Sequence, residues 1–545
     1  MRPRYQYGII ISGGDFVENT IKEFKTKSEF LLPINVIKYK NVLGLENLKK
    51  KRELCVSFHR QDKVTFLNAG AFVVLDFGKE ICGGIRIISS NANDQAKFHI
   101  RMGESLSEAM TPIGIKNAGN DHSPRDFEVL VPSLSDLTFG QSGFRFVYIE
   151  LCSEQPVEIQ SICAVNILPN FDFEAKIETD DEELNKIINT AAYTIKLCCQ
   201  QGYIWDGIKR DRLVWSGDLH QEMLTSFYLF GDIENIRNSI EFIRNDTPDN
   251  DWVNWLPTYS AWWVINLCDY CRKSGNLSFF IKNKAFANKI LLKINSCIDS
   301  NGNINIGGQD AYFLDWQTYG TDEAVIGTIA IFVMAAKRFL LFEENADAEA
   351  IILKLMPVLQ KSKPQLKQAK AFKYLAGGYG EDGVSGELEK DGVSGLSTFM
   401  AYYILTADAL SGGENMLSII KEYFGGMISR GATTFWEDFD IEWLKNSGRI
   451  DMLPSSDEKD IHGDFGNFCY KNFRHSLCHG WSSCLISFIV EQVIGLKIEK
   501  NKVVSITPNL YGLKHIYAEI PVGEDTLFLN IYEDKIETKY KRRNK

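Results

Sequence analysis

The hydrophobic pattern of this chain changes its period near Pro169. Before this residue, short apolar segments alternate with polar residues or are bounded by turn residues, as in 72–77, 83–88, 97–102, 144–151 and 157–167. Several short strands at regular spacing are typical of a β-sandwich. After Pro169, apolar residues recur with the period of an α-helix over roughly 320 residues. The sequence therefore predicts a β-domain followed by a large helical domain.

The helical region divides into segments that Gly, Asp and Pro separate. About ten to twelve helices in consecutive hairpins fit a closed ring of paired helices, an (α/α)6 barrel. A long superhelix is the alternative, but no repeat of fixed length is visible, which argues against a solenoid. The segment TDDE (179–182) resembles a capping box and predicts Thr179 as the N-cap of the first helix. The expected helices are 181–199, 219–229, 233–243, 259–273, 277–298, 323–342, 347–368, 396–410, 414–428 and 479–494.

Alternation returns at the end of the chain, in 527–531 and 535–540. We therefore expect a multidomain α+β protein in which the barrel has a β-domain on each side. The basic end of the chain is expected to be solvated and disordered; it contains Lys539, Lys541, Arg542, Arg543 and Lys545. The predicted domains are a lead-in segment with an edge strand and a helix (1–60), a β-sandwich (61–170), the barrel (171–497) and a C-terminal β-domain with the basic tail (498–545).

Charge and hydropathy exclude several classes of partner. The formal net charge is −11, and an acidic surface repels phosphate backbones, so no nucleic-acid partner is expected. No stretch approaches the roughly 20 apolar residues of a membrane span, and the first residues lack a secretory apolar region. The 12 cysteines show no short repeating pattern and are expected to be free thiols. We therefore expect a cytoplasmic protein without a membrane partner.

Four segments of the helical region combine carboxylates with tryptophan. They are YIWDGIKRDRLVWSGDLHQE (203–222), YFLDWQT (312–318), GATTFWEDFD (431–440) and SLCHGW (476–481), where His479 begins a helix. Glycosidic cleavage requires a pair of carboxyl groups, and tryptophan faces stack on the C–H faces of sugar rings. For Asp218 the simpler interpretation is an N-cap of the next helix. Because hairpin ends can converge on the mouth of an α/α barrel, a carboxylate-rich sugar pocket is expected there.

The same segments resemble the inverting α-L-rhamnosidases of glycoside hydrolase family 78. The family hallmark is roughly Asp-Cys-Pro-x-Arg-Asp-Glu-Arg-x-Gly-Trp-x-Gly-Asp, and this chain has DGIKRDRLVWSGD at 206–218. The family's Gly-Ala-Thr-Thr-Ile-Trp-Glu-Arg is similar to GATTFWED at 431–438, and its Ser-x-Asn-His is similar to SLCH at 476–479. Weaker similarity extends the resemblance to about 65–535, through LDFGKEICGG (75–84), GESLSEAM (103–110), DHSPRD (121–126) and FLDW (313–316).

The resemblance implies a function and a set of site residues. Asp211 takes the position of the family's general acid and Glu437 that of its general base. The other substrate-binding positions are Asp206, Arg210, Trp215, Asp218, Asp315, Trp316, Trp436 and His479. The expected substrate is a rhamnose-containing carbohydrate or glycoside that loses its terminal α-L-rhamnose with inversion. No metal or organic cofactor is expected, and a homodimer is a further expectation.

The chain departs from the family pattern at three points. The first motif is one residue shorter, Cys-Pro is replaced by Gly-Ile, and Asp211 must reach where a longer Glu usually lies. Asp438 replaces an Arg beside the general base, so the two adjacent carboxylates repel each other unless an Arg or Lys compensates. Two other functions therefore stay open. One is another α/α-barrel glycosidase, such as an unsaturated glucuronyl hydrolase, for which Lys209, Arg210 and Arg212 could bind a uronide. The other is a sugar-binding protein without turnover.

Overall fold

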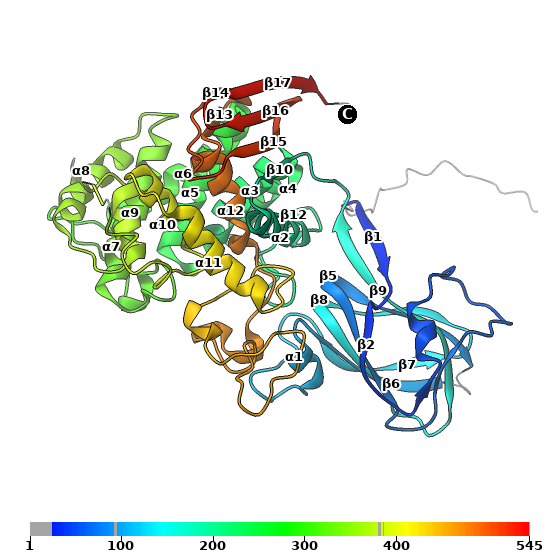
Figure 1. Ribbon diagram of the computed structural model, residues 1–545. Helices are drawn as coiled ribbons and strands as arrows, with labels where there is room; N and C mark the ends of the chain where they lie inside the picture. The colour runs from blue at the N-terminus through cyan, green and yellow to red at the C-terminus, as the bar shows by residue number, and fades with distance from the viewer. Residues whose placement is uncertain (1–23, 92–94, 380–382, 385, 544–545) are drawn as a thin grey trace, which may run out of the picture.

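The structure is a computed structural model, and it describes residues 24–91, 95–379, 383–384 and 386–543. Three bodies follow one another along the chain (Figure 1): a β-sandwich, a ring of helices and a small C-terminal sheet. A lead-in helix before residue 24 would lie outside the described residues. Within residues 24–60, three strands and a short 3-10 helix, Leu45–Lys49, join the sandwich.

The sandwich is one antiparallel sheet of nine strands that folds over on itself. Its spatial order is β3-β4-β9-β5-β8-β6-β7, with β1 on β9 and β2 on β5. The long strand β5 pairs with β2, β8 and β9, and its register shifts let it bend between layers. The strands are β1 (Thr26–Leu31), β2 (Asn35–Lys40), β3 (Val42–Leu43), β4 (Val64–Phe66), β5 (Phe72–Asn91), β6 (Gln95–Gly103), β7 (Asp126–Pro132), β8 (Asp136–Leu151) and β9 (Val157–Pro169).

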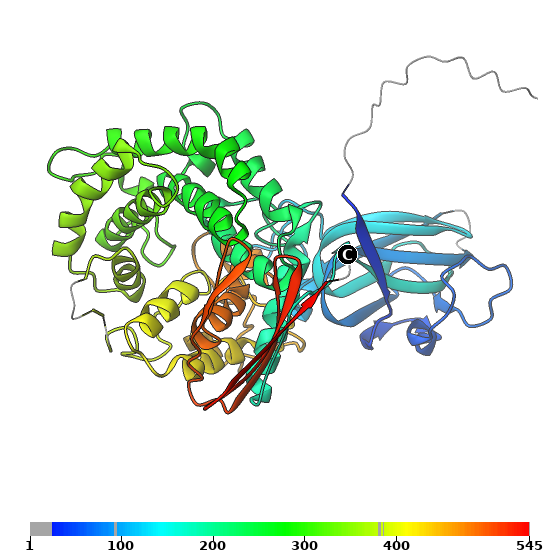
Figure 2. The same cartoon turned by 90° about the horizontal axis from the view of Figure 1, so that it is seen from above.

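The helical domain is a closed ring seen end-on in Figure 2. Successive inner helices pack on one another from α3 through α5, α7, α9 and α10 to α12, which returns to α3. Nearly every residue of α3 and α5 is buried, whereas α4 and α8 bury one face, as expected for an outer helix. The helices are α2 (Glu182–Cys198), α3 (Ser216–Phe230), α4 (Glu234–Asp246), α5 (Pro257–Ser274), α6 (Leu277–Ser296), α7 (Asp322–Phe339), α8 (Ala346–Lys361), α9 (Lys367–Leu375), α10 (Ala401–Leu410), α11 (Met416–Ser429) and α12 (Leu485–Phe488).

Short elements complete the molecule. A helix of the sandwich, α1 (Leu106–Met110), lies beside the loops at one end of the barrel (Figure 1), where Leu106 N–H donates to the Ile450 carbonyl. The 3-10 helices are Val253–Trp255, Gln309–Ala311, Ile441–Leu444, Phe468–Tyr470, Asn472–Arg474 and Gly480–Ser483, and Ile489–Val493 is a π-helix. The hairpins are β11 (Cys199–Gln200) with β12 (Tyr203–Ile204) and β13 (Leu496–Glu499) with β14 (Lys502–Ile506).

The C-terminal sheet takes one strand from the start of the barrel region. Its antiparallel order is β10-β15-β16-β17, with β10 (Lys176–Thr179), β15 (His515–Val522), β16 (Asp525–Tyr532) and β17 (Ile536–Arg542). The prediction of a disordered basic tail is wrong up to Arg543. Lys539, Lys541 and Arg542 belong to β17, and Arg543 pairs with Glu174. Ladder hydrogen bonds and this ion pair order the segment, while Lys545 lies outside the described residues.

The predicted Thr179 cap is wrong, and the alternative interpretation of Asp218 as an N-cap does not hold. The N-cap of α2 is Asp181, whose carboxylate accepts from the backbone N–H groups of Glu183 and Leu184. Thr179 instead accepts from the Asp181 N–H and bonds the Asn185 side chain, so the helix begins two residues later than a Thr179 cap requires. Asp218 is not an N-cap, since α3 begins at Ser216 and its N-cap position is Trp215.

Three predicted helices differ in extent from the structure. The predicted helix 347–368 is two helices, α8 and α9, because Pro364 falls between them and cannot continue a helix. The predicted helix 396–410 begins only at Ala401, and 479–494 is a succession of 3-10, α and π turns. None of the helices in the described part of the chain has the length and apolarity that a membrane crossing requires.

Candidate active site

The loop between β12 and α3 carries the first carboxylates. Asp206 and Leu213 pair at the base of this loop. The Asp206 backbone N–H donates to the Leu213 carbonyl at 3.0 Å, and Asp206 Oδ1 accepts from the Leu213 N–H at 2.9 Å. At the tip, Asp211 and Arg212 have φ angles of 57° and 55°, in the left-handed region that non-glycine residues rarely adopt. The closed base and the tight tip give the loop one defined shape, although it is one residue shorter than the family motif.

The segment with Glu437 is held by the segment that precedes His479. The Glu437 N–H donates to the Ser476 carbonyl at 2.9 Å, and the Ser476 N–H donates back to Glu437 Oε2 at 3.1 Å. The His479 N–H donates to the Phe435 carbonyl, and the Trp481 indole N–H donates to the Glu437 carbonyl at 2.9 Å. These contacts bury the acidic segment 431–440 almost completely, so it is not a solvated loop.

Arg210 joins the two segments. Its Nη2 donates to Glu437 Oε1 in a buried ion pair, and its Nη1 donates to Asp211 Oδ1 at 2.9 Å. The expected catalytic carboxylates therefore lie on the two terminal nitrogens of one guanidinium. Arg210 offsets the charge of Glu437, not that of the neighbouring Asp438. Burial, followed by repulsion from Glu437, raises the pKa of Asp438 to about 7.

His479 faces three carboxylates. Its Nε2 lies 3.7 Å from Asp206 Oδ2, 4.0 Å from Asp218 Oδ2 and 3.9 Å from Glu437 Oε1. Burial, with Arg210 nearby, holds the pKa of His479 well below its usual range. Burial raises the pKa of Asp206 far above its usual range and that of Asp218 to about 8, although the Tyr259 hydroxyl donates to Asp218. Near pH 7 these aspartic acids can therefore both donate to and accept from sugar hydroxyls.

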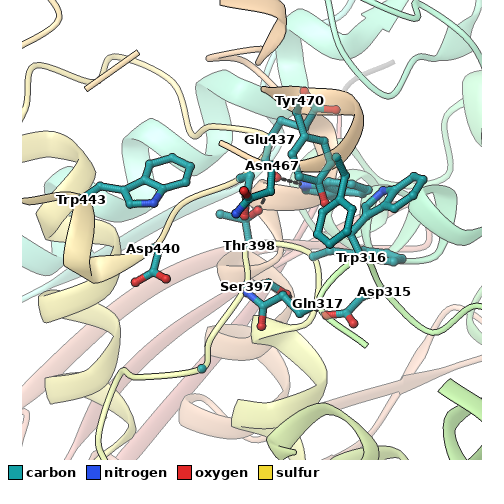
Figure 3. Close-up of a pocket in the computed structure, with 15 residues that line it drawn as sticks. Asp315, Trp316, Gln317, Ser397, Thr398, Glu437, Asp440, Trp443, Asn467 and Tyr470 are labelled. Carbon is teal, nitrogen blue, oxygen red and sulfur yellow. Dashed lines mark hydrogen bonds between the residues drawn. The ribbon is translucent and has the colours of Figure 1, made fainter. Parts of the chain in front are cut away.

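Two adjoining chambers open around Glu437. The first, which we call the Asp206 chamber, has a volume of about 260 Å³ and is lined by Asp206, Asp211, Trp215, Asp218, Asn254, Trp255, Leu256, Tyr259, Phe313, Trp316, Glu437, Cys469, His479 and Trp481. The second, the Asp438 chamber (Figure 3), has about 300 Å³ and shares Trp316, Glu437 and Trp481 with the first. Its other walls include Asp315, Asp438, Asp440, Trp443 and Tyr470.

The structure brings together most of the predicted site residues. Those that line the Asp206 chamber are Asp206, Asp211, Trp215, Asp218, Trp316, Glu437 and His479. Asp315 lines the Asp438 chamber instead, and Arg210 lies behind the first chamber as a bridge. Trp436 lines neither chamber, since only 1% of its surface is exposed and it packs edge-on against Phe439.

Sequence reasoning missed several residues of the pocket wall. Tyr259 lies on a helix with apolar residues on every side, so the hydrophobic pattern of this helix does not distinguish a face that lines a pocket. Trp481 ends the SLCHGW segment. Because it lies two residues after His479, a predicted substrate-binding residue, its position could have indicated that it lines the same pocket. Cys469, Asn467 and Tyr470 lie in an irregular stretch whose path no local pattern predicts.

The basic residues of the first motif do not face the chambers. The Lys209 ammonium is buried between Glu104 and Glu108, at 2.9 and 3.2 Å. The Arg212 guanidinium lies over the Trp205 ring, 4.7 Å from its centroid, and donates to the Gln141 carbonyl. Within the described residues, no Lys or Arg lines either chamber. A uronate would therefore lack the cation that its carboxylate requires.

Two groups of side chains have spacings that a cation could use. Asp206, Asp218 and His479 form one, and Glu104, Glu108 and His462 form the other, each with ligand atoms within 4.8 Å. In the second group the Lys209 ammonium already supplies the positive charge. In the first, the raised pKa values of both aspartates favour protonated carboxyls near pH 7, and these are poor metal ligands.

Comparison with known proteins identifies the class of this fold. Residues 172–272 match the family model of the bacterial alpha-L-rhamnosidase six-hairpin glycosidase domain. No curated protein matches the chain. The ring of helices is thus similar to a six-hairpin glycosidase domain, and the predicted α/α barrel with flanking β-domains is confirmed as the fold.

Several solved structures share the fold of this chain. A rhamnosidase of glycoside hydrolase family 78 from Bacillus sp. GL1 superposes with a TM-score of 0.70 at 17% identity, over 88% of this chain and 53% of its own. A Klebsiella oxytoca rhamnosidase with rhamnose bound gives 0.65 at 20%, over 86% and 96%. A Streptomyces avermitilis alpha-L-rhamnosidase complexed with L-rhamnose gives 0.65 at 13%, over 95% and 49%. The resemblance to this family that the motifs indicated is confirmed, and this chain spans about half the length of the Bacillus enzyme.

Proposed function

We propose that the chain is an inverting α-L-rhamnosidase that removes terminal α-L-rhamnose from a glycoside or oligosaccharide. The observation that carries the proposal is the meeting of Asp211 and Glu437 on Arg210 beside the Asp206 chamber. Aromatic side chains form much of the remaining wall, as a sugar ring requires. The Klebsiella and Streptomyces neighbours, which share the fold, contain rhamnose in their structures.

In the proposed mechanism, Asp211 protonates the glycosidic oxygen and Glu437 deprotonates a water molecule on the opposite face of the ring. Inversion requires the two carboxyl groups to be roughly 6.5–9.5 Å apart, with room for the water between them. The Arg210 guanidinium binds both carboxylates and so fixes their relative position. Asp206, Asp218 and neutral His479 bind the hydroxyls of the sugar.

The contacts of the basic residues disfavour the uronide alternative, because Lys209 and Arg212 point away from the chambers and Arg210 is paired twice. A sugar-binding protein without turnover would use the same hydroxyl-binding groups. It would not need two carboxylates to share one guanidinium, and this pairing favours the enzyme.

The test is hydrolysis of p-nitrophenyl α-L-rhamnopyranoside beside a panel of other aryl glycosides. We expect turnover of the rhamnoside alone, and a loss of about 10²–10⁴-fold in kcat for Glu437→Gln. Glu442→Gln is the matched control, since Glu442 lies five residues away and pairs at the surface with Lys445. Binding of L-rhamnose without turnover of any glycoside would instead establish the sugar-binding alternative.

The location and assembly of the protein are part of the same proposal. All twelve cysteines are free, which supports a reducing compartment such as the cytoplasm. A homodimer stays a prediction, and light scattering on the purified protein tests it.

A further inference from the structure

The β-sandwich reaches the candidate catalytic residues through the segment that follows β6. This segment, GESLSEAM (103–110), includes α1 and lies against the loops of the barrel (Figure 1). Its first carboxylate, Glu104, is completely buried, although it belongs to a different domain from every candidate catalytic residue. A buried carboxylate is costly unless it is paired and hydrogen-bonded, so its partners show where the domain interface is most constrained.

Glu104 contacts the segment that supports Glu437. Its Oε2 accepts from the Leu477 N–H at 2.6 Å, and its Oε1 accepts from the Ser476 hydroxyl at 3.2 Å. The N–H of Ser476 is the donor to Glu437 Oε2. One carboxylate of the sandwich therefore holds two consecutive residues of the barrel, and the first of them positions the expected general base.

Glu104 also contacts the loop that carries Arg210. The Lys209 ammonium lies 2.9 Å from Glu104 Oε2 and donates to the backbone carbonyls of Phe473 and His475. Lys209 directly precedes Arg210, which binds Glu437 and Asp211. Of the two supports of the catalytic carboxylates, Ser476 is thus bound by Glu104 directly, and Arg210 is linked to it through the adjacent Lys209.

The surroundings of Glu104 fix its orientation. The Glu104 N–H donates to Glu108 Oε2 at 2.8 Å, and Glu108 in turn lies 3.4 Å from the Arg125 guanidinium. Burial, with repulsion from Glu108 against attraction by Lys209, raises the pKa of Glu104 to about 7. His462 belongs to the barrel and packs against this group of charged residues. Its ring hydrogen-bonds to the Ser105 hydroxyl and to the His475 carbonyl.

We propose that Glu104 is a positioning residue of the active site, through which the β-sandwich sets the geometry of Glu437 and Arg210. The inference rests on the proposed function. It assigns the sandwich a part in catalysis: a barrel whose loops lack this anchor binds sugar but aligns the carboxylates poorly. Glu104 touches neither chamber, so its effect reaches the substrate only through Ser476, Lys209 and Arg210.

The experiment compares Glu104→Gln and Glu104→Ala with the wild-type protein in hydrolysis of p-nitrophenyl α-L-rhamnopyranoside. Gln keeps an acceptor for the Leu477 N–H but loses the charge that pairs Lys209, whereas Ala loses both. We expect kcat to fall about 10–100-fold for Gln, by analogy with supporting residues of other sites, and further for Ala. KM should stay within about threefold, because the groups that bind hydroxyls are untouched.

The control is Glu158→Gln. Glu158 is a carboxylate of the same sandwich, on β9, and it pairs with Lys63. We expect this variant to keep kcat within about twofold, which separates positioning by Glu104 from a general effect of removing a charge from the sandwich.

Thermal unfolding of each variant completes the experiment. If Glu104→Gln unfolds near the wild-type temperature and loses kcat at constant KM, the positioning role is established. If Glu104→Gln keeps the kcat of the wild type, or if kcat falls only in proportion to the folded fraction, the inference is wrong while the proposed function stands. If the wild-type protein cleaves no glycoside, both are wrong.

Discussion

Arg210 donates to Glu437 from one terminal nitrogen and to Asp211 from the other. A planar guanidinium can hold two carboxylates at once, whereas the single ammonium of a lysine cannot reproduce that geometry. The relationship explains how two acidic residues remain close together in a buried site that also contains Asp206 and Asp218. It also makes Arg210 the residue whose removal should disturb the site most without changing a carboxylate.

Replacing Arg210 by Lys should therefore lower kcat/KM for the aryl rhamnoside by about 10²-fold or more, because Glu437 and Asp211 lose their common support. Steady-state kinetics at pH 6 to 8 measure the effect. Arg542→Lys is the control, since Arg542 is exposed and pairs with Glu524 at the surface. Equal kcat/KM for Arg210→Lys and the control would show that the bridge has no part in the reaction.

Asp218 should make the folded protein less stable as pH rises. Burial raises its pKa to about 8 from an ordinary value of 3.8, so between these pH values the folded state holds a proton that the unfolded state has lost. The free energy of unfolding therefore falls as pH increases from about 4 to 8. Asp218→Asn removes this titration. At pH 8.5 the free energy of unfolding of this variant should exceed that of the wild type by about 1–3 kcal/mol, so it should unfold at a higher denaturant concentration.

The same Asn variant should lose activity, because it cannot reproduce both protonation states of Asp218 beside the sugar. Urea titrations at pH 5 and pH 8.5 test the stability claim independently of turnover. If the variant and the wild type differ by the same free energy of unfolding at both pH values, folding does not raise the pKa of Asp218.

Trp255 should contribute to substrate binding and little to stability. It lines the Asp206 chamber, yet 78% of its surface is exposed, and it packs edge-on against Trp215 at 6.2 Å between centroids. An aromatic contact with a sugar contributes about 0.5–1.5 kcal/mol, so Trp255→Ala should raise KM roughly 2–10-fold. The unfolding midpoint should change by no more than that of an ordinary surface substitution. A loss of stability with unchanged KM would place Trp255 in the core instead.

The start of the first barrel helix offers a test of the observed cap. Asp181→Ala should cost about 1 kcal/mol of unfolding free energy, since its carboxylate accepts from two backbone N–H groups and pairs with Lys421. Glu182→Ala should cost only a few tenths, because a capping box with Thr179 does not form. Chemical denaturation of both variants measures the difference. The reverse order would restore the capping box that the sequence indicated.

The architecture could be predicted because the hydrophobic period distinguishes strands from helices over long stretches. The inner helix α3 was recognisable despite burial on every side, since its flanks carry Gly and Asp. The ends of helices were less accessible: Asp181 and Thr179 are both good N-cap residues, and tertiary contacts decide between them. The basic residues of β17 were predicted to be disordered because the local charge pattern does not show that this segment pairs with β16.

The candidate site was partly predictable from motifs. Asp206, Asp218, Glu437 and His479 were placed together because their motifs resemble a family, and the structure does gather them. Trp436 lies in the same motif as Glu437 but packs in the core, edge-on against Phe439. The interface contacts of Glu104 lie hundreds of residues apart in sequence, and only the packing of the sandwich on the barrel brings them together.

The measurement that tests the central claim most directly is the configuration of the first sugar released from an aryl α-L-rhamnoside. Proton NMR during the first minutes of hydrolysis distinguishes the two anomers before they equilibrate. The account predicts β-L-rhamnose first, because Glu437 activates water on the face opposite the leaving group while Asp211 protonates it. Release of α-L-rhamnose first would contradict the account, since retention requires a covalent intermediate and a different arrangement of the two carboxylates.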